Sequence, residues 1–238
     1  MNDHASPSRW IAAGLIGLPL YGALTLWSSI TPQPDPGTQF DAWAKFVTTN
    51  EYVIGHLLGS GGGLIAGIFG TFALGVALAG TRARNLGLTG MVIAILGAAL
   101  FLLPMGVSTF SAPSEGFAYL ESGVQPAAPV PSLASQLMGA SFLAVIVLGL
   151  VGNVLLGIAI WRSHVLPKWA GVLWAAAPIL MYPLGVVYAL IINVHSTPPT
   201  VPVGAALMVI SGLWLLFGTV RPLSATGEGG VRAVSTHA

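Results

Sequence analysis

Six long stretches of this sequence contain no Asp, Glu, Lys or Arg, and each is dominated by apolar residues. An α-helix rises about 1.5 Å per residue, so about 20 residues cross the roughly 30 Å hydrocarbon core of a bilayer. Uncharged stretches of this length are typical of transmembrane helices. We therefore predict six spans, at Trp10–Ile30, Tyr52–Ala79, Leu86–Phe110, Leu133–Trp161, Trp169–Val194 and Val203–Val220.

The overall composition supports the same fold class. Only 6% of the 238 residues are charged and 55% are hydrophobic, whereas soluble domains carry about 25% charged residues. We expect an all-α protein with one six-helix transmembrane domain over residues 1–222 and a disordered tail over 223–238. The formal net charge of +1 gives no sign of a nucleic-acid partner. The absence of cysteine excludes disulfides and thiolate metal sites.

The charged residues between the spans predict the orientation. All basic residues except Lys45 fall on one side of the predicted spans, whereas most acidic residues fall on the other. The positive-inside rule then places both termini in the cytoplasm. The composition resembles that of bacteria with GC-rich genomes, so we expect a multi-pass protein of the bacterial cell (inner) membrane, with the lipid bilayer as its first partner.

Two segments on the predicted outer side differ in character. Residues 38–49 place Phe40, Trp43 and Val47 on one helical face, which predicts a short amphipathic helix on the outer leaflet. An irregular loop with chance spacing is the alternative. Residues 111–132 are rich in proline and small residues, and we expect a loop that either covers the outer mouth or links two spans.

The second predicted span, EYVIGHLLGSGGGLIAGIFG over residues 51–70, combines a histidine with a run of glycines. The glycines at every fourth position form one helical face, and in lipid such small residues let helix backbones approach closely. We expect similar small-residue faces on the third and fourth spans to oppose it, and Asn153 to form a hydrogen bond between helices. The predicted packing residues are Gly55, Gly59, Gly63, Gly67 and Asn153.

His56 lies about 7.5 Å further along the helix than Glu51, just below the outer interface. One interpretation is a structural histidine that donates a hydrogen bond across a helix interface. The other is a cofactor site in which His56 and His195, both predicted near the outer side, bind haem or a metal ion. That site needs the two rings on opposite sides of one ion, with their ligating nitrogens about 4–5 Å apart.

The fifth predicted span contains Pro178 and Pro183, with Tyr182 between them, which makes it the best candidate for an interrupted helix. Interrupted helices line binding sites in some transporters. A small-solute transporter or channel is therefore a further hypothesis. No span contains a carboxylate, and no catalytic motif with the right context is present, so the sequence does not support an enzyme.

The stretch WRSHVLPKWAGVLW over residues 161–174, together with the glycine-rich second span, resembles small uncharacterised bacterial multipass membrane proteins of the domain-of-unknown-function type. The resemblance covers residues 50 to 190. It implies a multipass membrane fold and assigns no site residues.

Small-residue packing and a nearly uncharged interior favour a non-enzymatic protein. Our leading hypothesis is that it binds a small apolar ligand or a lipid, or supports a partner membrane protein. A homo-oligomer is also compatible with these features.

Overall fold

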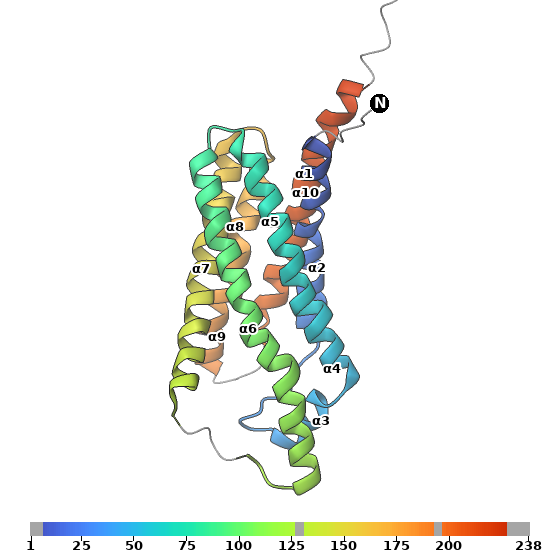
Figure 1. Ribbon diagram of the computed structural model, residues 1–238, viewed down its shortest axis with the longest axis vertical. Coiled ribbons are helices and arrows are strands. Elements are labelled where there is room, and N and C mark those ends of the chain that lie inside the picture. Colours follow the sequence, from blue (N-terminus) through green and yellow to red (C-terminus); the bar gives the residue numbers. More distant parts are fainter. Residues whose placement is uncertain (1–6, 127–130, 193–196, 228–238) are drawn as a thin grey trace, which may run out of the picture.

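The computed structural model describes residues 7–126, 131–192 and 197–227, without the side chains of residues 7, 8 and 220–227. Every regular element in these ranges is a helix, and Figure 1 shows the long helices side by side. Six segments are long and apolar enough to cross a membrane, which confirms the all-helical class and the number of predicted spans. They are Arg9–Ile30, Asn50–Ala79, Arg84–Ser122, Leu133–Ser163, Lys168–Ile192 and Thr200–Thr219.

The first span consists of two helices, α1 (Pro7–Leu15) and α2 (Gly17–Ile30). Pro19 has no N–H group to bond to the carbonyl of Leu15, which interrupts the α-helical hydrogen-bond pattern at this point. Ile16 instead bonds its N–H to the carbonyl of Ala13 at 3.3 Å. Pro19 thus lies in the first turn of α2, where proline is tolerated.

The second span begins as α4 (Asn50–Ile54), becomes a π-helical segment η1 (Gly55–Gly62), and continues as α5 (Gly63–Ala79). The side chain of Thr49 caps α4 by accepting a hydrogen bond from the backbone N–H of Tyr52 at 3.2 Å. π-Helical segments are rare and frequently occur at functional sites. The sequence predicts a regular helix here, and the π-helical segment is a difference that the structure shows.

The third span, α6 (Arg84–Ser122), has 39 residues and is therefore about 58 Å long, well beyond a bilayer core. The prediction that the outer loop begins at residue 111 is wrong, because the helix continues through Pro113 to Ser122. The extension is packed against another element. A Cβ on Gly116 would lie 2.7 Å from a methyl carbon of Val47, and the rings of Tyr119 and Phe40 lie 4.9 Å apart.

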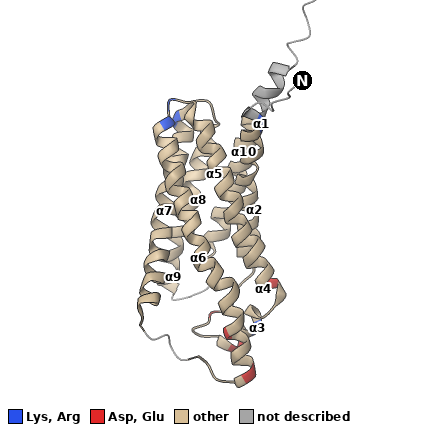
Figure 2. Ribbon diagram, in the orientation of Figure 1, with Lys and Arg blue, Asp and Glu red and all other residues tan. Residues whose placement is uncertain are grey.

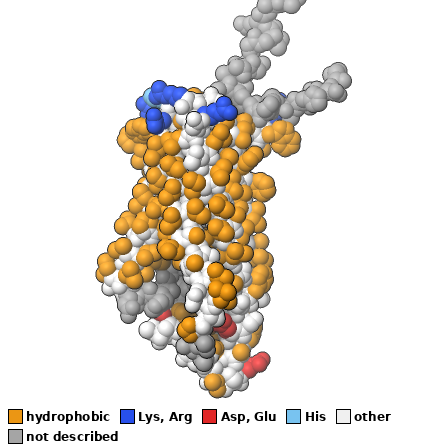
Figure 3. Space-filling model, turned by 60° about the vertical axis from the view of Figure 1, so that its left-hand side comes forward, with side chains coloured by type: hydrophobic (Ala, Val, Ile, Leu, Met, Phe, Trp, Pro, Cys, Tyr) orange, Lys and Arg blue, Asp and Glu red, His pale blue; other side chains and the backbone are white. Residues whose placement is uncertain are grey.

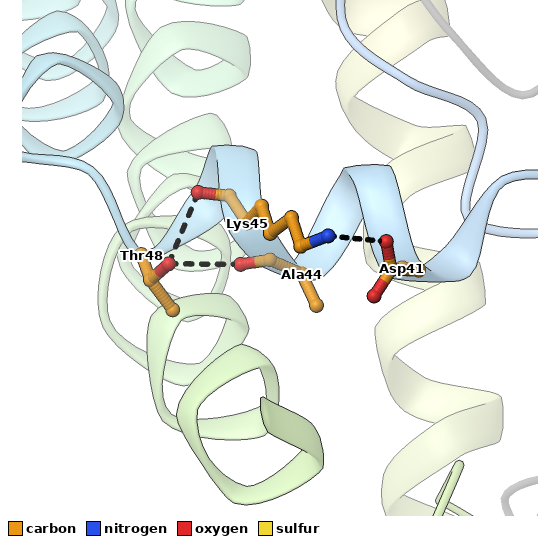
Figure 4. Close-up of polar contacts among 4 residues, drawn as sticks. All are labelled: Asp41, Ala44, Lys45 and Thr48. Atoms are coloured by element: carbon orange, nitrogen blue, oxygen red, sulfur yellow. Dashed lines mark hydrogen bonds and ion pairs between the residues drawn. The ribbon is translucent and has the colours of Figure 1, made fainter. Parts of the chain in front are cut away.

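That packing partner is α3 (Phe40–Val47), which confirms a helix in the segment 38–49 and excludes an irregular loop there. Ala44 and Val47 are fully buried. Lys45 forms an ion pair with Asp41 at 2.7 Å, and the Thr48 hydroxyl donates to the carbonyls of Ala44 and Lys45 (Figure 4). The buried face of α3 therefore packs against the end of α6.

The remaining elements are α7 (Leu133–Ser163), α8 (Lys168–Ile179), the π-helical segment η2 (Leu180–Leu184), α9 (Gly185–Ile192) and α10 (Thr200–Gly227). The expected interruption of the fifth span is not found, since α8, η2 and α9 follow one another without a break. A π-helical turn accommodates Pro183 instead. α10 continues past the expected domain boundary at residue 222, and residues 228–238 of the predicted tail lie outside the described part.

The two ends of the molecule differ in charge (Figure 2). Basic residues gather at the end where α5 joins α6 and α7 joins α8, and these joins carry Arg82, Arg84 and Arg162. Acidic residues lie at the other end, on α3, α4 and the end of α6, which carry Asp41, Glu51 and Glu121. We call the halves of the spans nearest these ends the basic half and the acidic half. Figure 3 shows hydrophobic side chains covering the middle of one face, between the two ends. The main hydrophobic core, which includes Leu74, Leu156, Ile160 and Trp174, belongs to the basic half.

Candidate functional site

A cavity of about 620 Å³ lies between the spans in the acidic half. Its size falls within the range of small-molecule sites in proteins. All six spans contribute to its walls, and both π-helical segments line it. The lining residues are Tyr21, Thr25, Ser28, Ser29, Gln33, His56, Ser60, Leu64, Phe101, Met105, Ser108, Phe142, Val145, Ile146, Met181, Tyr182, Gly185, Val186, Ala189, Thr197, Pro198 and Val201.

The cavity has a polar wall and an apolar wall. α2 and η1 supply most of the hydroxyl groups and the imidazole of His56, whereas the lining residues of α7 are all apolar. None of the described lining residues is Asp, Glu, Lys or Arg. The site therefore offers neutral hydrogen-bonding groups on one side and dispersion contacts on the other.

A chain of hydroxyl groups connects η1 to α2 on the polar wall. The Ser60 hydroxyl donates to the Ser28 hydroxyl at 3.2 Å, and Ser28 donates to the backbone carbonyl of Thr25 at 3.1 Å. Close approach of the two backbones makes this contact possible: a Cβ on Gly59 would lie only 2.6 Å from the Cβ of Ser28. Glycine at this position therefore brings the serines of two spans within hydrogen-bond distance.

The glycine face of the second span packs against the first span, and not against the third and fourth spans as expected. Gly63 faces Leu24 and Thr25, and Gly67 lies against the ring of Tyr21. Gly55 differs from the rest of the predicted face, because no atom lies within 4 Å of where its Cβ would be. The third and fourth spans use their own small residues to pack against each other, as Gly90 and Gly97 of α6 contact α7.

His56 is held by its own span. Its Nδ1 lies 3.0 Å from the carbonyl oxygen of Tyr52, one turn earlier, and the two rings lie 4.0 Å apart. The Tyr52 hydroxyl in turn donates to the carbonyl of Ser108 on α6 at 3.0 Å. His56 also lines a smaller crevice of about 30 Å³ beside Glu51. The histidine therefore lies at the boundary between the cavity and the acidic end of the molecule.

The second residue of the predicted cofactor site, His195, lies outside the described residues. The separation of His56 and His195 therefore stays untested, and a haem or metal site formed by them remains a prediction. Among the residues that the structure describes, no group of three or more His, Cys, Asp or Glu side chains could hold a metal ion.

Asn153 lies away from the cavity, in the basic half. Its amide nitrogen donates to the carbonyl of Gly149 at 2.8 Å, and its oxygen accepts from the indole N–H of Trp174 on α8 at 3.0 Å. The whole group is buried. This pair satisfies two polar groups inside the helix packing and joins the fourth span to the fifth.

Most residues of the polar wall are not among the site residues predicted from the sequence. Tyr21, Thr25 and Ser28 are spaced by four and three residues, so they share one face of α2. Polar residues at this spacing in an apolar span would have indicated the face. Tyr182, which lines the cavity from the fifth span, follows no such pattern.

Comparison with known proteins identifies no relative of this chain. No family model, no curated protein and no solved structure gives a significant match to this chain.

Proposed function

We propose that this chain is a non-enzymatic, multi-pass protein of the bacterial inner membrane that binds a small apolar ligand or a lipid in the cavity of its acidic half. The single observation that carries the proposal is the cavity itself, with about 620 Å³ between six apolar spans and an apolar wall. Clefts of this kind bury most of the surface of a small ligand. A membrane provides apolar molecules at high local concentration.

Access from the lipid side supports the same proposal. Every residue from 131 to 140, at the start of α7, is exposed, and no atom lies near the position of a Cβ on Gly139. Phe101 of α6 and Phe142 of α7 line the cavity with ring centroids 6.4 Å apart. An apolar molecule in the bilayer would enter beside the exposed start of α7, on the acidic side of this ring contact.

Native mass spectrometry of the protein purified in mild detergent tests this function. We expect a bound small molecule in the wild-type protein and its loss in Val186→Trp, because Val186 lines the cavity and the larger side chain takes up space that the ligand would occupy. The matched control is Val187→Trp, since Val187 is the next residue of α9 and does not line the cavity. Retention of the ligand in both variants would rule the cavity out as its site. A protein that carries no ligand but migrates with a second membrane protein would favour support of a partner.

We also propose that both termini face the cytoplasm, so that the cavity belongs to the outer half of the membrane. The gathering of Arg82, Arg84 and Arg162 at one end supports this orientation. The chain has no cysteine, so a single introduced thiol reports one position. In spheroplasts of a bacterial host, a membrane-impermeant maleimide should label Thr38→Cys directly and Gly80→Cys only after permeabilisation. The reverse pattern would invert the orientation.

The cofactor hypothesis has its own test. An ultraviolet–visible spectrum and elemental analysis of the purified protein should show neither a Soret band nor a stoichiometric metal if the cavity binds an apolar ligand alone. A band or metal that disappears in His56→Ala would instead make His56 a ligand of a haem or metal site.

A further inference from the structure

The charge of the cavity wall restricts the head group of the ligand. The described lining residues include no charged side chain. The sequence between Ile192 and Thr197, which joins two lining segments, is Asn-Val-His-Ser and adds no Asp, Glu, Lys or Arg. Burying a phosphate or an ammonium group without a counter-charge is strongly unfavourable. Glu51, which lines the small crevice beside His56, would repel an anion further.

The hydrogen bonds of the polar wall show which groups are left for a ligand. The Ser60 hydroxyl donates its hydrogen to Ser28, and the Ser28 hydroxyl donates its own to the carbonyl of Thr25. The Ser60 oxygen therefore keeps lone pairs that can accept a hydrogen bond from a ligand. A carbonyl can only accept, so the contact between Nδ1 of His56 and the Tyr52 carbonyl places the proton of the neutral imidazole on Nδ1. Nε2 of His56 is then an acceptor as well.

Two tyrosine hydroxyls of the cavity supply a donor. Tyr21 and Tyr182 line the cavity from the first and fifth spans, and each carries a phenolic hydroxyl that can donate a hydrogen bond. Each hydroxyl carries one hydrogen, and a bond between the two would use only one of them, so at least one hydrogen is left for an acceptor on the ligand. The cavity therefore presents both acceptors and a donor, and a hydroxyl group is the smallest head group that satisfies both.

We infer that the ligand is an uncharged amphiphile whose head group carries at least one hydroxyl and whose tail is apolar, as in a monoacylglycerol or a long-chain alcohol. Its head would contact Ser60 and His56, and its tail would follow the apolar wall formed by Phe101, Phe142 and Val145. This inference rests on the proposed function, because it names the class of ligand for the same cavity.

Four probes with one oleoyl chain test the head group separately from the tail. The delipidated full-length protein is titrated with monooleoylglycerol, methyl oleate, oleate at pH 8 and oleoyl lysophosphatidylglycerol, and native mass spectrometry measures the bound fraction. We expect saturable one-to-one binding of monooleoylglycerol. Methyl oleate, which has no hydroxyl, should bind about two- to tenfold more weakly, as expected for one or more lost hydrogen bonds. Both charged probes should bind at least about tenfold more weakly.

The variant Ser60→Ala links the preference to the polar wall. It should weaken monooleoylglycerol binding by about two- to tenfold and leave methyl oleate binding unchanged. Ser141→Ala is the matched control, because the Ser141 hydroxyl bonds only to its own helix at the carbonyl of Met138 and does not line the cavity. The wild-type series decides the question even if a variant fails to fold.

The outcomes separate this inference from the proposed function. Binding of none of the four probes would contradict both. Equal binding of methyl oleate and monooleoylglycerol would overturn the hydroxyl head group but leave an apolar-ligand site. Tighter binding of either charged probe would overturn the uncharged head group in the same way.

Discussion

The basic and acidic halves of the same six spans are packed in opposite ways. In the basic half, small residues bring backbones into contact: Gly152 of α7 meets Ala94 of α6, and Gly157 meets Gly171 of α8. In the acidic half, a Cβ on Gly55 or Gly139 would have no atom of another segment within 4 Å, both π-helical segments occur, and the cavity opens between the spans. Glycine therefore gives close packing at these contacts of the basic half, whereas the acidic half combines close contacts, such as that of Gly59 with Ser28, with open positions at Gly55 and Gly139.

This difference has a physical basis in the bilayer. Lipid tails are as apolar as the side chains, so helices associate through close contacts and hydrogen bonds rather than through the hydrophobic effect. The basic half has both, including the buried pair Asn153 and Trp174. A half that is held together in this way can position the other half around a cavity. Close packing that stabilises the fold and the proposed binding site therefore lie in different halves of the same helices.

Gly152→Leu should have the largest effect of the substitutions considered, because a Cβ at this position would lie 2.6 Å from the Cα of Ala94 and the backbone cannot yield easily. We expect the protein to lose about 3 kcal/mol of stability or to fail to assemble. The matched control is Gly139→Leu in the same helix, where nothing lies within 4 Å of the new Cβ. Thermal unfolding in detergent measures both. Similar midpoints for the two variants would show that the halves do not differ in packing.

The buried hydrogen bond of the basic half should matter more than a comparable one of the acidic half. Asn153→Ala leaves the buried indole N–H of Trp174 without its acceptor, which typically costs about 1–3 kcal/mol. Ser108→Ala should cost much less, because the Tyr52 hydroxyl keeps its bond to the Ser108 backbone carbonyl. The measurement is again thermal unfolding, with Asn153→Ala and Trp174→Phe combined in a double-mutant cycle. A zero coupling energy would contradict the role assigned to this pair.

The smallest effect is expected for Asp41→Asn on α3. The hydrogen bond and the charge of Asp41 raise the pKa of Lys45, so the charged lysine is stabilised in the folded protein. This contribution is present at neutral pH and is lost only as the pH rises through the raised pKa of Lys45. The pair is exposed, however, and exposed ion pairs contribute little. The wild type and Asp41→Asn should therefore unfold at the same temperature at pH 7. A decrease as large as that of Asn153→Ala would show that α3 contributes more to the fold than its ion pair indicates.

The positions of the spans could be predicted from the sequence because apolar content is a property of each segment by itself. The end of α6 could not, because the stretch around Pro113 and Gly116 has weak helix preference and is helical where it packs against Val47 and Phe40 of α3. Likewise, the spacing of four residues between Gly59, Gly63 and Gly67 predicted a close contact with another helix. Only the structure shows that α2 is the partner.

The candidate site was predictable to a smaller extent. His56 was predicted as a site residue because it is an ionisable group inside a span, and it lines the cavity. The residues that complete the polar wall come from different spans, with Ser60 on η1, Ser28 on α2 and Tyr182 on η2. Their spacing along the chain contains no information about their distance in space, so their convergence could not be inferred.

The sequence by itself determined the helical class, the number of membrane-length helices and the separation of basic from acidic segments. Each of these follows from local composition, because the free energy of transferring a segment into a bilayer depends on the residues of that segment. The tertiary structure decided which faces meet, where π-helical segments replace regular helix, and that a cavity opens in the acidic half. These features depend on contacts between distant segments, because a cavity is a property of several helices together and of none of them alone.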